Sequence, residues 1–165
     1  MKVLLIFYED LVKNKQEILS LMEKNFKAIK RFFGIDTVYA SITSSFLEVF
    51  NLFPDICLIN NLRGTINYGI YKGLRKLKDN DVVIIDAGKE IKESVVRKTF
   101  LSDKPYLFLK DGDWYGIAFV PRREVYYVIK SFEKNPEKGI MEAFNFLKKT
   151  YGIDYELVDI DTLNG

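Results

Sequence analysis

The residues with the clearest chemical potential are carboxylates that directly follow apolar runs. Asp86 comes after the run at 82–85, and Asp159 and Asp161 close the last apolar run of the chain. Carboxylate oxygens are ligands that Mg²⁺ and Mn²⁺ prefer, and such a cation can bridge phosphate oxygens during group transfer. We expect one of Asp159 and Asp161 to share a site with Asp86. The pattern predicts a cation site at Asp86 with Asp159 or Asp161; the alternative is that Asp86 ends a strand and the other two are solvated.

A Gly-Thr pair gives a second candidate, a contact site for a phosphate or for the edge of a nucleotide base. Gly64 and Thr65 precede a stretch with apolar residues at helical spacing, so we expect the pair to open a helix. The free N–H groups and partial positive charge of a helix N-terminus favour an anion there. An ordinary turn followed by a threonine N-cap explains the same pair, and both interpretations stay open.

The residue types that the chain lacks limit its chemistry. It contains no His, which excludes histidine general bases, Ser-His-Asp triads and histidine metal ligands. A metal site must then use oxygen ligands, which points to Mg, Mn or Ca rather than Zn. The single Cys, Cys57, lies in an apolar run and is expected to be a small buried hydrophobe in a reducing, cytoplasmic setting.

Length and composition describe one domain that spans residues 1–165. Of these residues 48% are hydrophobic, enough for a full core. The net charge of +2 shows no basic excess, so we expect no nucleic-acid partner, whereas phosphorylated small molecules stay compatible. The apolar run at 3–7 is too short for a signal peptide or a membrane span, so we expect no membrane contact. The aromatic content of 15% fits a core, or an exposed face for a partner protein or a second copy of the chain.

The elements that must position these residues alternate between strand and helix. Continuous apolar runs such as 3–7 and 82–85 are typical of strands that are buried on both faces, as in parallel sheets. Asp111-Gly112 lies between two β-rich runs and predicts a hairpin. We expect strands at 3–7, 37–42, 56–59, 82–85, 105–109, 114–120 and 155–158, and helices at 18–33, 44–50, 66–77, 91–100, 125–132 and 140–147.

This order predicts an α/β fold with three layers, α/β/α, around a mixed, mainly parallel sheet that contains one antiparallel strand. In such folds ligands bind beyond the carboxyl ends of the parallel strands. We therefore expect Asp86 and Gly64 at that edge of the sheet.

The sequence resembles the GT-A-like nucleotidyltransferases, which include molybdenum cofactor guanylyltransferases, methylerythritol phosphate cytidylyltransferases and sugar-phosphate nucleotidyltransferases. The resemblance implies a Rossmann-like fold of the nucleotide-diphospho-sugar transferase type, with a nucleotide or nucleotide sugar near Gly64 and Thr65. It also implies Mg or Mn at Asp86 with Asp159 or Asp161. The positions that carry the resemblance are Gly64-Thr65, Gly73-Leu74, Asp86-Ala87-Gly88, the strand at 116–119 and the ending at 158–162.

The segment after the first strand departs from this family. Members have a Gly-rich loop with an Arg, followed by a Lys, which together cradle the triphosphate. Here residues 8–14 contain no Gly and no Arg, and they bring two carboxylates, Glu9 and Asp10. Backbone anion nests need glycine-like freedom, so this loop is poorly suited to phosphate. Gly88 also stands where a second metal-side Asp is expected.

The resemblance implies three alternative functions. An active member would transfer a nucleotidyl group from an NTP to a phosphorylated small molecule. A non-catalytic relative would bind a nucleotide or a protein partner, which the missing loop and the missing second Asp favour. A small glycosyltransferase would use a nucleotide sugar at the same site, and residues 4–10 resemble the start of bacterial GT-A-like glycosyltransferases.

Overall fold

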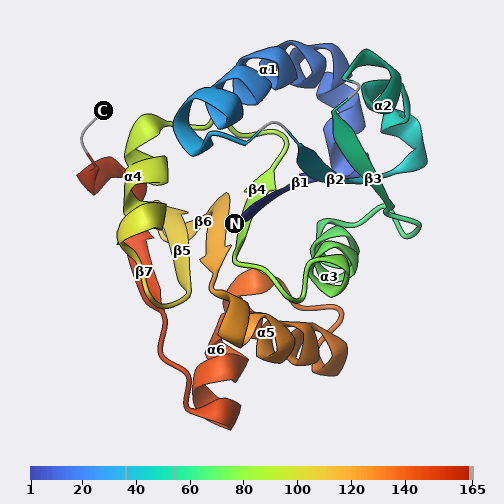
Figure 1. Cartoon of the computed structure of the whole chain (residues 1–165). Coiled ribbons are helices and arrows are strands. Elements are labelled where there is room, and N and C mark those ends of the chain that lie inside the picture. The colour runs from blue at the N-terminus through green and yellow to red at the C-terminus, as the bar shows by residue number, and fades with distance from the viewer. Residues whose placement is uncertain (36, 54, 164–165) are drawn as a thin grey trace.

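A computed structural model describes residues 1–35, 37–53 and 55–163, which form one seven-stranded sheet (Figure 1). The strand order is β3-β2-β1-β4-β6-β5-β7. Strand β6 runs antiparallel to its neighbours β4 and β5, and the other pairs are parallel. The prediction of a mainly parallel sheet with one antiparallel strand is confirmed. The strands are β1 (Lys2–Phe7), β2 (Val38–Ile42), β3 (Ile56–Asn60), β4 (Val82–Asp86), β5 (Tyr106–Lys110), β6 (Asp113–Val120) and β7 (Glu156–Asp159).

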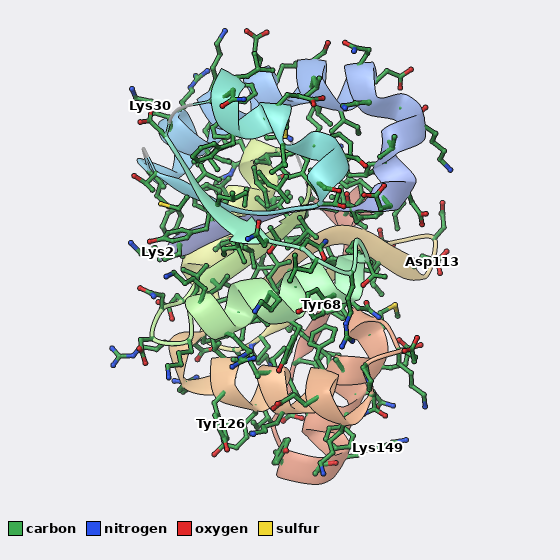
Figure 2. The ribbon with its side chains drawn as sticks, turned by 90° about the vertical axis from the view of Figure 1, so that its right-hand side faces the viewer. Lys2, Lys30, Tyr68, Asp113, Tyr126 and Lys149 are labelled. Atoms are coloured by element: carbon green, nitrogen blue, oxygen red, sulfur yellow. The ribbon has the colours of Figure 1, made fainter. Side chains whose placement is uncertain are left out.

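Helices cover both faces of the sheet, so the predicted three layers are present. One core lies between the sheet and α1, α2 and α4, and the other between the sheet and α3, α5 and α6 (Figure 1). Figure 2 shows these layers from the side, with Tyr68 on α3. The helices are α1 (Lys15–Ala28), the π-helical η2 (Ile29–Phe33), α2 (Glu48–Leu52), α3 (Ile66–Lys76), α4 (Glu93–Leu101), α5 (Arg122–Lys134) and α6 (Ile140–Tyr151), with 3₁₀ turns η1 (Glu9–Asn14), η3 (Ser44–Phe46) and η4 (Ile160–Thr162).

Strands β1 and β4 form the buried centre of the sheet. Residues 3–7 have no exposed surface, because helices cover these strands on both faces. Their register pairs Ile6 with Asp86, so both strands end at the same level. Strands β2 and β3 run parallel to them, and the residues after all four strands therefore gather at one edge. This edge holds the candidate site.

Strand β3 lies at the other side of the sheet and has a neighbour on one side only. Its residue Cys57 is exposed, so the prediction of a buried cysteine is wrong. An apolar run alone does not distinguish an edge strand from a central one. None of the helices in the described ranges combines the length and apolar character that crossing a bilayer requires.

Candidate functional site

Asp86 stands at the end of β4, at the carboxyl edge of the sheet where the sequence places it. Its side chain is enclosed: the residue is 6% exposed. The phenol of Tyr8, the first residue after β1, donates a hydrogen bond to Oδ2 at 2.7 Å. The backbone N–H of Gly88 donates to Oδ1 at 2.8 Å. Both carboxylate oxygens thus have donors from the protein itself.

The surroundings of Asp86 determine its electrostatics. Burial raises the pKa of the Asp86 carboxyl above its ordinary value, while the bonds from Tyr8 and Gly88 and the Lys89 ammonium act in the opposite direction. Burial, together with the charge of Asp86, also raises the pKa of the Tyr8 phenol. The phenol therefore stays protonated at neutral pH and acts as a donor.

Backbone and hydrocarbon close the remaining space around this carboxylate. A Cβ on Gly116 of β6, whose φ is +106°, would lie 2.9 Å from the Asp86 Cβ. A Cβ on Gly88 would lie 3.0 Å from Leu11 Cδ2. A divalent cation needs several oxygen ligands, whereas Asp86 has an ammonium, a phenol donor and apolar groups beside it. These residues do not fit a metal ion.

The structure does not bring together the carboxylates that the sequence predicts as metal ligands. Asp159 ends β7, and strands β6 and β5 separate β7 from β4, which puts the strands roughly 14 Å apart at about 4.8 Å per pair. Asp159 Oδ1 accepts from the Asp161 N–H at 2.9 Å, and Asp161 lies 3.9 Å from the Lys110 ammonium. Within the described residues, no group of three or more Cys, Asp or Glu side chains could hold a metal ion.

Gly64 and Thr65 lie at the same edge as Asp86, on the other side of β1. Thr65 is the N-cap of α3, as expected, and its hydroxyl accepts from the Tyr68 N–H at 3.1 Å. Gly64 has a φ of +70°, a conformation that favours glycine. Its carbonyl accepts from the Glu9 N–H at 2.9 Å. The turn and cap are therefore formed, and ligand contact at this pair stays a prediction.

Glu9 closes the space over Gly64. Its carboxylate accepts from the hydroxyls of Thr43 and Ser45, with both Ser45 contacts at 3.0 Å. A Cβ on Gly64 would meet the Glu9 Cγ at 2.7 Å, so the side chain lies directly across the glycine. Tyr8 and Glu9 hence hold the segment after β1 against β4 and against the residues after β2. We call these two side chains with their hydrogen bonds the clasp.

Asn61, which the sequence interpretation passed over, is the most unusual polar group at this edge. It is 2% exposed, and its Nδ2 donates to the carbonyls of Phe7 and Thr65 at 3.1 and 2.9 Å. Its Oδ1 is buried and has no hydrogen-bond partner in the described part of the chain. Its place two residues after the apolar run 56–59 was the available signal.

A cavity of about 260 Å³ with both polar and apolar lining residues lies beside these groups. Asn61 is in its wall, and the turn at 61–64 forms one side of it. Residues at and after the end of β2, together with Glu9, also line it. Its lining consists of Glu9, Ile42, Thr43, Ser44, Leu47, Asn60, Asn61, Leu62, Arg63 and Gly64.

Comparison with solved structures shows which known proteins have a similar fold. A 4-diphosphocytidyl-2C-methyl-D-erythritol synthase from Anaerococcus prevotii has a TM-score of 0.70 at 12% identity, with 96% of this chain and 87% of that one covered. Molybdopterin-guanine dinucleotide biosynthesis protein A from Archaeoglobus fulgidus gives 0.60 at 9%, with 98% and 85% covered. A Mycobacterium tuberculosis protein solved in complex with manganese gives 0.55 at 9%, with 97% and 88% covered.

No protein-family model and no curated protein sequence matches the chain. Identities of 9–14% are too low to carry a function from one protein to another, but the likeness extends over nearly the whole chain. This chain has the fold of the GT-A-like nucleotidyltransferases.

Proposed function

We propose that this chain is a single-domain, non-catalytic relative of the nucleotidyltransferases that binds the nucleoside part of a nucleotide and does not transfer it. The ligand would occupy the cavity beside Asn61 and Gly64. The observation that carries the proposal is Asn61, a residue of the cavity wall whose buried Oδ1 has no hydrogen-bond donor among the described residues.

The clasp argues against a bound triphosphate. In the active relatives that the sequence resembles, a Gly-rich loop after the first strand cradles the phosphates. Here the Glu9 carboxylate stands across Gly64 instead, and Asp10 follows it. Two like charges about 4 Å apart near a protein surface repel by roughly 4 kcal/mol. Phosphate is therefore disfavoured at this position.

The state of Asp86 argues against metal-dependent transfer. Its two oxygens already accept from Tyr8 and Gly88, and an ammonium rather than a second carboxylate is its charged neighbour. Mg or Mn would have to displace the Tyr8 phenol and find further oxygen ligands. The metal-dependent alternatives, nucleotidyl transfer and glycosyl transfer, would both need this displacement.

Asn61 supports binding of a base or sugar. Its Nδ2 is fixed by two carbonyls, so the side chain cannot rotate to satisfy Oδ1 without losing those bonds. A buried acceptor without a donor costs about 1–3 kcal/mol. Because Oδ1 is buried, an amino group of a nucleobase or a sugar hydroxyl would supply the missing donor and recover part of this cost only after the cavity wall shifts to expose this oxygen. Other hydrogen-bonding groups line the cavity at Thr43 and Asn60.

Isothermal titration calorimetry with each nucleoside and its triphosphate, with and without Mg or Mn, tests the proposal. We expect one nucleoside to bind independently of metal, its triphosphate to bind no tighter, and no pyrophosphate release with phosphorylated acceptors. Ser44→Trp should block the cavity, and Ser20→Trp, another exposed serine, is the matched control.

Three outcomes would overturn it. Absence of any nucleoside binding at millimolar concentration would remove the proposed ligand. Metal-dependent pyrophosphate release from an NTP would establish a nucleotidyltransferase instead. Turnover of a nucleotide sugar would establish a glycosyltransferase.

A further inference from the structure

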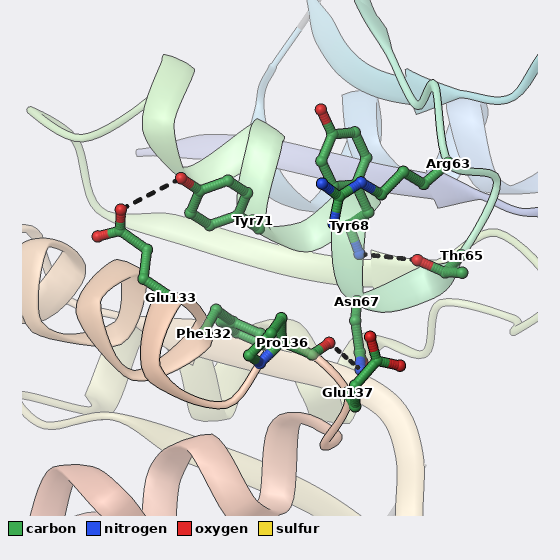
Figure 3. A pocket seen from close by; sticks show the side chains of 9 residues that line it. All are labelled: Arg63, Thr65, Asn67, Tyr68, Tyr71, Phe132, Glu133, Pro136 and Glu137. Carbon is green, nitrogen blue, oxygen red and sulfur yellow. Dashed lines mark hydrogen bonds between the residues drawn. The ribbon is translucent and has the colours of Figure 1, made fainter.

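A larger cavity, of about 480 Å³, lies between α3, α5 and the turn that follows α5 (Figure 3). Its volume is in the range of small-molecule sites. Tyr68 and Tyr71 come from α3, Phe132 and Glu133 from α5, and Pro136 and Glu137 from the turn. The sequence motifs of the nucleotidyltransferase resemblance do not include these aromatic and acidic side chains.

The cavity is held open by hydrogen bonds between its two sides. Asn67 of α3 donates through Nδ2 to the carbonyl of Lys138 at 2.8 Å and to that of Pro136 at 3.5 Å. These bonds fix the turn after α5 relative to α3 (Figure 3). At the opposite end, the Tyr71 hydroxyl donates to Glu133 Oε2 at 3.3 Å. The walls are thus preformed.

The aromatic walls already accept a cation of the chain itself. The Arg63 guanidinium lies 4.8 Å from the centre of the Tyr68 ring. The electron-rich face of an aromatic ring attracts ammonium and guanidinium groups, and more strongly when water is excluded. Tyr71 also lines the cavity (Figure 3), and its ring has the Arg75 guanidinium 5.5 Å from its centre, whereas Phe132 lies beneath it and is only 2% exposed.

The charges at the far side of the cavity also favour a cation. Glu133 pairs with Lys130 at 3.2 Å and with Tyr71, so its charge is partly balanced. Glu137 makes no ion pair or hydrogen bond with the residues that the structure describes, and Figure 3 shows its carboxylate beside the cavity. Helix α5 ends at Lys134, and the partial negative charge of a helix C-terminus adds to the same preference.

We propose that this cavity binds an organic cation, a guanidinium or alkylammonium group, beside the ring of Tyr71 and paired with Glu137. The cation can be a free diamine-type metabolite or the side chain of a basic residue in a peptide. The proposal does not depend on nucleoside binding, because Arg63 is the one lining residue that the two cavities share, and Tyr71 and Glu137 line this cavity alone.

Calorimetry with three probes tests it: agmatine, a capped Gly-Arg-Gly peptide, and the same peptide with citrulline, the neutral isostere of arginine. We expect binding of agmatine, of the arginine peptide, or of both, and no binding of the citrulline peptide. Agmatine without the peptide indicates a free metabolite, and the peptide without agmatine indicates a basic protein segment.

Two exposed glutamates give a matched pair of variants. Glu137→Gln should weaken cation binding about fivefold, the size of a surface ion pair, and Glu142→Gln on α6 should leave it unchanged. Tyr71→Ala should abolish binding, while Tyr71→Phe, which keeps the ring, should retain it. Binding of citrulline as tight as that of arginine, unaltered affinity in Glu137→Gln, or no binding of either cation at millimolar concentration would each overturn the proposal.

Discussion

Replacing Tyr8 by Phe removes the phenol that donates to Asp86 and leaves the ring in place. The hydrogen bond is short, at 2.7 Å, and it reaches a carboxylate that is 6% exposed. A hydrogen bond to a charged group contributes about 1.5–3 kcal/mol, and the isosteric ring adds no cavity. We therefore expect Tyr8→Phe to lower the free energy of unfolding at neutral pH by about 2 kcal/mol. For a chain of this length that corresponds to a fall in Tm of roughly 4–8 °C.

The loss of stability in Tyr8→Phe should depend on pH, and the direction of this dependence follows from how tightly Asp86 binds its proton. Burial raises the folded-state pKa of Asp86 above the ordinary 3.8, so the folded chain binds this proton more tightly than the unfolded chain. The contribution of Asp86 to stability hence falls as the pH rises from 3.8 through the raised folded value. Loss of the Tyr8 donor raises that value further. The loss in free energy of unfolding caused by Tyr8→Phe should be largest at neutral pH. It should be smaller near pH 3.8, where Asp86 is protonated.

Urea unfolding of both proteins at neutral pH and near pH 3.8 measures this difference. Tyr126→Phe, at an exposed tyrosine of α5, is the control and should leave stability unchanged. Asp86→Asn removes the buried charge, so Tyr8→Phe should cost much less in that background. An equal deficit at both pH values, or one below about 0.5 kcal/mol at neutral pH, would refute the assignment of Tyr8 as the donor that stabilises a buried carboxylate.

Three further outcomes follow from the same edge of the sheet. Glu9→Gln removes the charge over Gly64 and should tighten triphosphate binding by about fivefold to about a thousandfold, as repulsion of about 1 kcal/mol in bulk water or about 4 kcal/mol near a protein surface implies; calorimetry that finds no change would contradict the proposed repulsion between Glu9 and phosphate. Gly116→Ala should destabilise the chain by about 3 kcal/mol, and Gly112→Ala by about 1 kcal/mol. Of these two positions, only Gly116 has atoms that a new Cβ would meet. Equal losses of stability in thermal unfolding would contradict this expectation. Mg or Mn should leave the Tm unchanged, since Asp86 has no free oxygen; a metal-dependent rise that Asp86→Asn abolishes would show that the clasp opens for a cation.

The local patterns of the sequence were sufficient to predict the strands and helices and the edge of the sheet at which Asp86 and Gly64 lie. Apolar runs predicted the buried strands β1 and β4, and Thr65 caps α3 as expected. Asp111-Gly112 forms the turn between β5 and β6, with positive φ at both residues. These features depend on residues close in the chain, on side-chain periodicity and on backbone preference. The alternation of strands and helices then placed Asp86 and Gly64 at the carboxyl edge of one sheet.

Only the tertiary structure decided which groups meet at that edge. Insertion of β6 and β5 between β4 and β7 separates Asp86 from Asp159, and no local pattern specifies that order. The partner of Asp86 is Tyr8, 78 residues away, and that of Glu9 is Thr43. The sequence by itself determined a mainly parallel α/β sheet with a carboxylate at its carboxyl edge. Packing of distant segments determined that this carboxylate is buried and accepts hydrogen bonds. The free energy of the carboxylate depends on neighbouring groups that the chain brings close only when it folds.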